Sequence, residues 1–366
     1  MIVKDEAHVI ARCLTSVLPV IDTWLIVDTG STDGTPGAIE TFFDQAGKPG
    51  RVVHRPWRDF GTNRTEALEL ARPLADYCLF IDADEVWSAP DGFQLPDLSA
   101  DAYRVLHRHK ETDTKFWLTQ LVKSHLPFRF QGVLHEALSC DAPHTLAQLT
   151  GPLITGWFDS ARNRLSPVEK YSRDALVLER ALEDEPDNAR YVFYLAQSHR
   201  DAGALEAAKS AYARRVKMGG WEEEAWYAAL WVARLAEKLG QHEEATIGLL
   251  GAYERRPTRA EPLCDLARLH RSRKDFHLAY LFAKKAATLP VPDDVLFVEE
   301  GVYRWRAWDE VAVAAYWVGE YAECKSIGER LLESGVVPLE ERARIEKNCA
   351  FAAQKLDAVA SSGRAP

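Results

Sequence analysis

The chain has 366 residues, which is enough for two or three domains of ordinary size. Its apolar share of 47% and charged share of 27% are those of a globular protein and exclude a disordered or fibrous chain. The formal net charge is −10 and no dense run of Lys and Arg occurs, so we expect no nucleic-acid partner. The most basic stretch, residues 211–217, is expected to form a solvated helix face.

Cysteine usage and hydropathy bear on the compartment. The six cysteines are scattered without a Cys-x-x-Cys pair, which argues against a zinc ribbon and against a disulfide scaffold. No apolar run approaches the length of a membrane span, and the first ten residues resemble a strand with charges rather than a signal peptide. We therefore expect a cytoplasmic protein with no membrane span.

Residues 1–156 alternate short apolar runs with helical stretches and turns rich in Gly and Asp. In chain order the pattern predicts a strand at 1–3, a helix at 7–17, strands at 24–27 and 51–54, a helix at 63–71 and a strand at 78–81. Such alternation is typical of a parallel α/β sheet. The first domain is therefore placed at 1–156, and the polar stretch 157–170 is expected to be a linker.

Residues 171–366 change to amphipathic helices rich in Ala, Leu, Glu and Arg, and an internal repeat is visible in them. The stretches that align are 195–208, 232–245, 266–279 and 313–324. Each has a small residue midway along a first helix, then a turn, then a small residue in a second helix, which is the tetratricopeptide pattern. Such helix pairs stack into a superhelix with a concave face.

Three segments of the first domain deliver polar groups at the carboxyl ends of apolar strands, where open α/β sheets bind ligands. They are residues 2–6, 27–35 and 80–85. If the chain stays extended, Asp82 and Asp84 point the same way and repel unless a cation lies beside them. Hard oxygen ligands favour Mg²⁺ or Mn²⁺, which can bridge to a diphosphate. An Asp-x-Asp in an exposed turn is the alternative.

Asp28 closes the second strand and precedes a tight loop whose backbone amides can face an anion or a ribose. Ser31, Thr32 or Asp33 can instead cap the following helix. The two interpretations are compatible, because a cap does not use Asp28.

The stretches MIVKDE, WLIVDTGSTDGT, NRTEAL and LFIDADE resemble family 2 glycosyltransferases with the GT-A fold, over roughly residues 1–140. The later repeats resemble tetratricopeptide arrays, and the whole resembles bacterial S- and O-glycosyltransferases that join the two. The resemblance implies an α/β, Rossmann-like GT-A domain with a mostly parallel sheet, followed by an all-α superhelical domain. It also implies a UDP-sugar donor and a divalent metal.

The resemblance places Val3, Lys4, Asp5 and Glu6 at the edge of the nucleotide pocket, with backbone contacts from Val3 to the base. The family's usual Lys-Asn-Glu is Lys4-Asp5-Glu6 here, which makes this edge more acidic.

The same resemblance assigns roles to the side chains further along. Asp28 would contact the uracil or ribose with Ser31 close by, and Arg64 would lie near the base or diphosphate. Asp82 would bind the ribose or the metal's shell, and Asp84 would ligate the metal.

Inverting transfer needs a carboxylate that takes the acceptor's proton. Glu136 is the first candidate, at an apparent helix start in residues 130–138, and Asp113 in a polar loop is the second. His135 is expected to complete the metal's shell or donate to the diphosphate. Alternatively, His135 and Glu136 cap a helix or pair with Arg129.

Two classes of function follow. The first is a metal-dependent inverting glycosyltransferase that acts on an acceptor, such as a peptide or protein, held by the repeats. The second is a peptide-binding scaffold with a degenerate GT-A domain. A nucleotidyltransferase is disfavoured because Lys4-Asp5-Glu6 is not a glycine-rich phosphate loop. Self-association through the repeats stays open in both.

Overall fold

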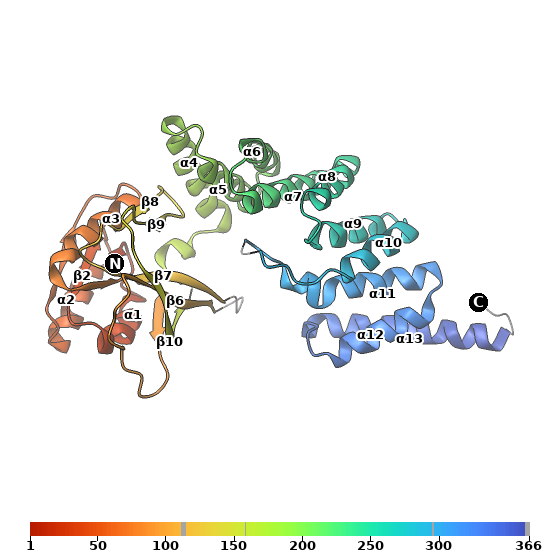
Figure 1. The fold of residues 1–366 in the computed structure, drawn as a ribbon, viewed down its shortest axis with the longest axis horizontal. Helices are drawn as coiled ribbons and strands as arrows, with labels where there is room; N and C mark the ends of the chain where they lie inside the picture. Colours follow the sequence, from red (N-terminus) through yellow and green to blue (C-terminus); the bar gives the residue numbers. More distant parts are fainter. Residues whose placement is uncertain (111–114, 158, 295, 363–366) are drawn as a thin grey trace. The chain divides into compact units, whose positions relative to one another are not determined.

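The computed structural model describes residues 1–110, 115–157, 159–294 and 296–362 (Figure 1). The chain divides into two compact units, Met1–Pro186 and Asp187–Pro366. The division falls after helix α4 (Pro167–Asp184), so the stretch expected as a linker belongs to the first unit. This stretch belongs to the first unit because Asp159 pairs with Arg12 near the start of the chain, and Arg162 pairs with Asp174 of α4.

The first unit contains the expected parallel sheet. Its strands are β1 (Ile2–Val3), β2 (Trp24–Asp28) and β3 (Gly50–His54), in that order. The register aligns Val3 with Asp28 and Asp28 with His54. The carboxyl ends of all three strands therefore meet in one row, which is where the sequence places its polar groups.

Three helices accompany this sheet: α1 (Ile10–Val17), α2 (Thr35–Ala46) and α3 (Phe60–Ala71). α1 and α2 each bury an apolar face, and the helical spacing of residues 7–17 predicts that of α1. Trp24 of β2 stacks on Phe43 of α2 with ring centroids 4.3 Å apart. Asp59 caps α3 by accepting from the backbone of Thr62. Short 3₁₀ turns follow α1 (Leu18–Val20) and α3 (Arg72–Leu74).

A second sheet of five strands has the order β4-β7-β6-β10-β5. Its strands are β4 (Tyr77–Leu79), β5 (Glu85–Ser88), β6 (Ala102–His109), β7 (Lys115–Lys123) and β10 (Leu146–Gly156). Among these strands only the β6–β10 pair is parallel. The parallel arrangement expected from the sequence thus holds for β1–β3, and residues 102–156 add strands that the periodicity did not indicate. A hairpin of β8 (Arg129–Gln131) and β9 (Ala137–Ser139) lies apart from both sheets in hydrogen bonding.

The second unit is a helical array (Figure 1). Its helices are α5 (Ala189–Asp201), α6 (Leu205–Met218), α7 (Glu222–Lys238), α8 (His242–Arg255), α9 (Glu261–Ser272), α10 (Phe276–Ala287), α11 (Ala307–Val318), α12 (Tyr321–Glu333) and α13 (Leu339–Ser362). A π-helical turn, Val302–Arg306, precedes α11. The four repeats predicted from the sequence are the pairs α5/α6, α7/α8, α9/α10 and α11/α12, which confirms them.

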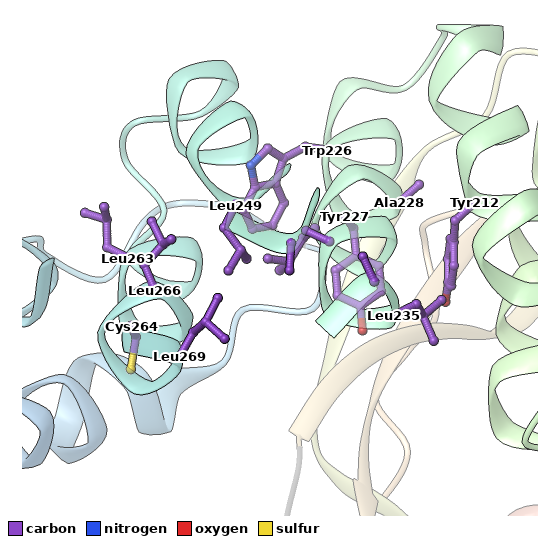
Figure 2. Packing of buried hydrophobic residues seen from close by; sticks show 14 of the residues in the cluster. Tyr212, Trp226, Tyr227, Ala228, Leu235, Leu249, Leu263, Cys264, Leu266 and Leu269 are labelled. Atoms are coloured by element: carbon purple, nitrogen blue, oxygen red, sulfur yellow. The ribbon is translucent and has the colours of Figure 1, made fainter. Parts of the chain in front are cut away.

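Small residues let the helices of each pair approach. The equivalent first-helix positions are at most 1% exposed and are all alanine: Ala196, Ala233, Ala267 and Ala314. Larger side chains fill the space between pairs, as Figure 2 shows for Trp226, Leu249 and Leu266. The apolar face of each pair is therefore buried by its neighbours, as stacking repeats require.

Two expectations about the whole chain can be compared with the described residues. None of their helices is both long and apolar enough to cross a bilayer. All six cysteines are unpaired thiols. The absence of a disulfide among them agrees with their scattered spacing.

Candidate active site

Asp28, the last residue of β2, is buried and surrounded by hydrogen-bond donors. The backbone N–H groups of Gly30 and Ser31 donate to its carboxylate at 3.2 Å, and His54 Nδ1 lies 3.1 Å from Oδ2. Burial by itself would raise the pKa of Asp28, but hydrogen bonds from Ser31 and His54 outweigh it and lower the pKa. Asp28 is thus held ionised at the sheet edge. His54 was not predicted from the sequence, and only the β2–β3 register brings it here.

The residues after β1 are fixed to the loop after β2. The backbone N–H of Asp5 donates to Ser31 Oγ at 2.9 Å, and that of Thr32 donates back to Asp5 Oδ1 at 2.7 Å. Asp5 has a φ of 58°, in the left-handed region that Asp tolerates better than most residues. Asp5, which stands where the family usually has asparagine, therefore joins the residues after β1 to the loop after β2. A nucleotide-binding role for Asp5 stays a prediction.

Val3 and Lys4 differ in their surroundings. The carbonyl of Val3 accepts from both the N–H (2.9 Å) and the hydroxyl (3.0 Å) of Thr29, so this oxygen is already used inside the protein. Lys4 is exposed. The expected base contact of Val3 would have to come from another backbone atom.

Arg64 of α3 joins two acidic residues that lie far apart in the sequence. Its Nη2 donates to both carboxylate oxygens of Asp82, at 2.7 and 2.8 Å, and its Nε lies 2.7 Å from Glu136 Oε1. Burial would lower the pKa of Arg64, but the charges of Asp82 and Glu136 raise it instead. The sequence predicts all three as site residues, and the structure brings them into one ion-pair network.

The geometry expected for Asp82 and Asp84 is wrong. The strand ends at Leu79, and the chain turns at 83–84, where the N–H of Glu85 donates to Asp82 O at 3.1 Å. The two side chains consequently have different partners: Asp82 binds Arg64, whereas Asp84 lies beside Ser160 and Asn163. The turn, closed by a hydrogen bond, replaces the extended backbone that the prediction assumed.

Unlike Asp82, which pairs with Arg64, the carboxylate of Asp84 has neutral partners. Its described contacts are a hydrogen bond with Ser160 and a 3.5 Å approach of Asn163 Nδ2. Burial, and next the negative charge of Asp82, raise the pKa of Asp84. A desolvated carboxylate next to a second one is an environment that a cation stabilises.

Residues 159–163 wrap onto this acidic region within the first unit. Arg12 makes a bidentate pair with Asp159 at 2.6 and 2.7 Å. The N–H of Ala161 lies 3.2 Å from both carboxylate oxygens of Glu6. Burial raises the pKa of Glu6 to about 7, and the Ala161 amide partly opposes this. Sequence reasoning missed this segment because a polar stretch containing Pro reads as a linker.

Glu136 and His135 lie between β8 and β9 rather than at a helix start, so that expectation is wrong. The N–H groups of a hairpin pair across strands, and His135 takes a φ of 52°, which no α-helix accommodates. His135 is exposed, whereas the side chain of Glu136 is only 13% exposed. Burial raises the pKa of Glu136, and the charge of Arg64 opposes the rise. Asp113, the second candidate base, lies outside the described residues.

At the candidate site, Asp84 is the carboxylate that best fits a divalent cation. Within the described part of the chain, no three His, Cys, Asp or Glu side chains are placed to hold a metal by themselves. Asp84 offers hard oxygen ligands that are not tied to a cation of the protein. Mg²⁺ sites commonly use one or two carboxylates and complete their shell with substrate phosphates and water. Asp84 thus suits a metal that arrives with a diphosphate.

A cavity of about 340 Å³ lies in this unit between β1, β2 and β4. Apolar side chains such as Leu14, Ile26 and Leu121 line it together with Arg64, whereas Asp28, Asp84 and Glu136 do not. The cavity therefore borders the ion-pair network at Arg64.

The parallel sheet, the buried carboxylate at the end of β2 and the acidic turn after β4 define a glycosyltransferase domain. Residues 1–93 match the family model described as glycosyl transferase family 2. The chain is 30% identical to a TPR repeat-containing protein of Synechococcus elongatus over 305 residues, which cover 78% of this chain and 73% of that protein. The chain therefore belongs to the family 2 glycosyltransferases that carry tetratricopeptide repeats.

Two further relatives match shorter regions. The lipopolysaccharide core biosynthesis glycosyltransferase LpsC of Rhizobium meliloti is 36% identical over 98 residues, which are 26% of this chain and 34% of LpsC. The SPbeta prophage-derived glycosyltransferase SunS of Bacillus subtilis is 25% identical over 219 residues, which are 54% of this chain and 47% of SunS. The chain covers about a third and about half of these two proteins.

Proposed function

We propose that this protein is a metal-dependent glycosyltransferase that moves a sugar, with inversion, from a UDP donor to an acceptor. The observation that carries the proposal is the network in which Arg64 holds Asp82 and Glu136, while the carboxylate of Asp84, two residues from Asp82, has the neutral partners Ser160 and Asn163. Carboxylates that are desolvated and lie beside a second carboxylate are concentrated at functional sites, which supports the proposal.

We propose a separate task for the main residues of the site. Asp28, ionised and oriented by His54, accepts hydrogen bonds from the uracil or ribose. Glu136 takes the proton of the attacking acceptor group as the bond to the anomeric carbon forms and the bond from that carbon to UDP breaks. Arg64 positions Glu136 and Asp82 relative to each other. A divalent cation bound by Asp84, with His135 as a further candidate ligand, would stabilise charge on the departing UDP.

The repeats are proposed to hold the acceptor, a peptide or a protein, in the cytoplasm. Superhelical repeat domains present an extended surface formed by their first helices, which suits a chain-like partner. Homo-oligomerisation through the same unit is the alternative use of that surface.

The test measures UDP release from UDP-glucose, UDP-N-acetylglucosamine and UDP-galactose with and without MnCl₂. We expect metal-dependent hydrolysis of one donor, and we expect Asp84→Ala to reduce it at least 100-fold, on the scale of an electrostatic catalytic group. Asp97→Ala, at an exposed carboxylate of the same unit, is the matched control and should change nothing. Full activity of Asp84→Ala would refute the metal site.

The alternative, a peptide-binding scaffold, predicts a different result. A scaffold would hydrolyse none of the three donors, and its melting temperature would not shift with UDP and MnCl₂, although its helical circular dichroism would be normal.

A further inference from the structure

His54, the last residue of β3, is the exposed neighbour of the buried Asp28. The register of β2 and β3 aligns the two residues, and their side chains meet, with His54 Nδ1 3.1 Å from Asp28 Oδ2. The side chain of His54 is 70% exposed, whereas that of Asp28 is 4% exposed. Most of the imidazole therefore faces outward at the edge of the sheet where the nucleotide is proposed to bind.

The backbone around His54 is held in place by the neighbouring strand and by Arg55. The N–H of Arg55 donates to the carbonyl oxygen of Asp28 at 2.9 Å, and Arg55 Nη1 donates to the carbonyl oxygen of His54, also at 2.9 Å. Arg55 is itself paired through Nε with Glu66 of α3. Side chains carried by strands are positioned more precisely than side chains on loops. His54 is thus placed to make a directional contact with a ligand.

Asp28 determines which nitrogen of the His54 ring carries a hydrogen. Burial would raise the pKa of Asp28, but hydrogen bonds from Ser31 and His54 lower it, so the carboxylate is ionised and only accepts hydrogen bonds. His54 Nδ1 must therefore donate to it. In the neutral imidazole the other nitrogen, Nε2, then has a lone pair and no hydrogen. Among the described residues Nε2 has no hydrogen-bond partner, so the ring presents an unused acceptor.

The carboxylate of Asp28 has little surface left for a base. The N–H groups of Gly30 and Ser31 approach its oxygens at 3.2, 3.2 and 3.3 Å, and His54 approaches at 3.1 Å. These contacts use about as many lone-pair sites as an ionised carboxylate has. A base is a large planar group, and the exposed surface that it would meet beside Asp28 is the ring of His54.

Uracil and cytosine differ at the position that an acceptor would contact. Uracil has an N–H donor at N3, whereas cytosine has an unprotonated nitrogen there. An acceptor such as His54 Nε2 forms a hydrogen bond with uracil N3–H, but it would face the lone pair of cytosine N3. A binding site discriminates between two such ligands because the wrong one leaves a hydrogen-bonding atom unpaired.

We propose that His54 Nε2 accepts the N3–H of uracil and so selects uridine over cytidine nucleotides, with Asp28 as the positioning residue that fixes the imidazole tautomer. The inference rests on the proposed function, since it concerns the donor nucleotide of that same site. It gives the base to His54 and leaves the ribose to Asp28. Because the ring is largely exposed, water competes for Nε2, and the selectivity is about tenfold rather than the far larger factors of buried sites.

The test measures the Kd of UDP and of CDP by calorimetry with MnCl₂ at pH 8, above the ordinary titration range of imidazole. For the wild-type chain we expect UDP to bind about tenfold tighter than CDP. His54→Asn keeps an amide N–H that can donate to Asp28 in place of Nδ1, but it has no atom at the position of Nε2. We expect this variant to bind UDP about tenfold more weakly, to bind CDP as the wild type does, and so to lose the selectivity.

His54→Gln should change the selectivity in a different way. Its longer side chain can place an amide at the position of Nε2, and an amide offers an oxygen acceptor to uracil or an N–H donor to cytosine. We therefore expect CDP to bind this variant at least threefold tighter than it binds the wild type. His125→Asn, at an exposed histidine of the same unit, is the matched control and should keep the tenfold preference for UDP.

Three results would overturn the inference and leave the proposed function intact. Equal weakening of UDP and CDP in His54→Asn would make His54 only a support for Asp28. An undiminished preference for UDP in that variant would assign the base to another group, and an unchanged affinity of His54→Gln for CDP would show that no ligand atom meets this position. If neither nucleotide binds the wild-type chain, the proposed function itself is refuted, and the inference with it.

Discussion

A single nitrogen of Arg64, Nη2, donates to both carboxylate oxygens of Asp82, at 2.7 and 2.8 Å. One aspartate of the Asp-x-Asp sequence is therefore neutralised by the protein itself. Nε of the same guanidinium lies 2.7 Å from Glu136 Oε1. Arg64 thus ties the turn after β4 to the β8–β9 hairpin, and a change at this one residue should disturb both.

Arg64→Lys should lower turnover about 100-fold, because an ammonium cannot hold two carboxylates in a fixed geometry and small displacements of catalytic groups cost that much. Loss of charged hydrogen bonds should also lower the free energy of unfolding by about 2 kcal/mol. Donor turnover and urea unfolding measure the two effects. Arg55→Lys is the control: its pair with Glu66 is about a third exposed on both sides, so less than 1 kcal/mol should be lost.

Glu136→Gln should abolish turnover and spare donor binding. A general base contributes about 10² to 10⁴ in rate, and glutamine keeps the shape of the side chain but takes no proton. We expect the Kd for UDP with MnCl₂ to stay within about threefold of wild type, as measured by calorimetry. Because burial raises the pKa of Glu136, the acidic limb of the wild-type pH–rate profile should lie above the ordinary range of glutamate. Loss of UDP binding instead would give Glu136 a binding role.

The spacing of apolar and small residues along the sequence predicted those helices whose formation depends on residues close in sequence. The helical spacing of Ile10, Leu14 and Val17 predicted α1, and the alanines and turns of the repeats predicted the helix pairs of the second unit. The strands of residues 102–156 were missed, because their stability comes from pairing partners that no short window contains. Arg215, in the stretch expected to be solvated, is 1% exposed and pairs with Glu224 of the next helix at 2.6 Å.

At the candidate site, the sequence predicted residues that the structure brings together, but it did not predict how they are arranged. Asp82, Glu136 and Arg64 were each predicted, whereas the pairing of both carboxylates with the guanidinium of Arg64 follows only from tertiary packing. His54 escaped prediction because its contact with Asp28 depends on strand register rather than on a motif. Ser160 escaped because no sequence signal links it to Asp84.

Glu6 should make the first unit less stable as the pH rises. Burial raises its pKa in the fold to about 7, above the ordinary glutamate value of 4.5, so the folded state holds a proton that the unfolded chain has lost. That contribution is complete below about pH 4.5 and is lost as the pH rises through 7. Melting temperatures in EDTA at pH 5 and pH 8 measure it.

Glu6→Gln supplies the control for this pH dependence. Glutamine still accepts from the Ala161 amide but cannot ionise. We expect the variant to melt higher than wild type at pH 8 and to show a smaller difference between pH 5 and pH 8. An undiminished difference would assign the effect to other groups, of which Glu85, with a pKa raised to about 8 by burial and next by Asp82, is the first to examine.

Lys274→Gly should stabilise the repeat unit. The turn between the two helices of a repeat has a positive φ at Gly203 (83°), Gly240 (76°) and Gly319 (94°), and the third repeat places Lys274 there at 66°. A side chain in the left-handed region costs about 1–2 kcal/mol, and glycine's greater freedom in the unfolded chain returns part of that gain. We therefore expect the free energy of unfolding to rise by about 0.5–1 kcal/mol in urea, followed by helical circular dichroism. Gly240→Ala, the reciprocal change in the preceding repeat, should lower it by about 1 kcal/mol. A loss of stability in Lys274→Gly would mean that the lysine side chain contributes more than its backbone conformation costs.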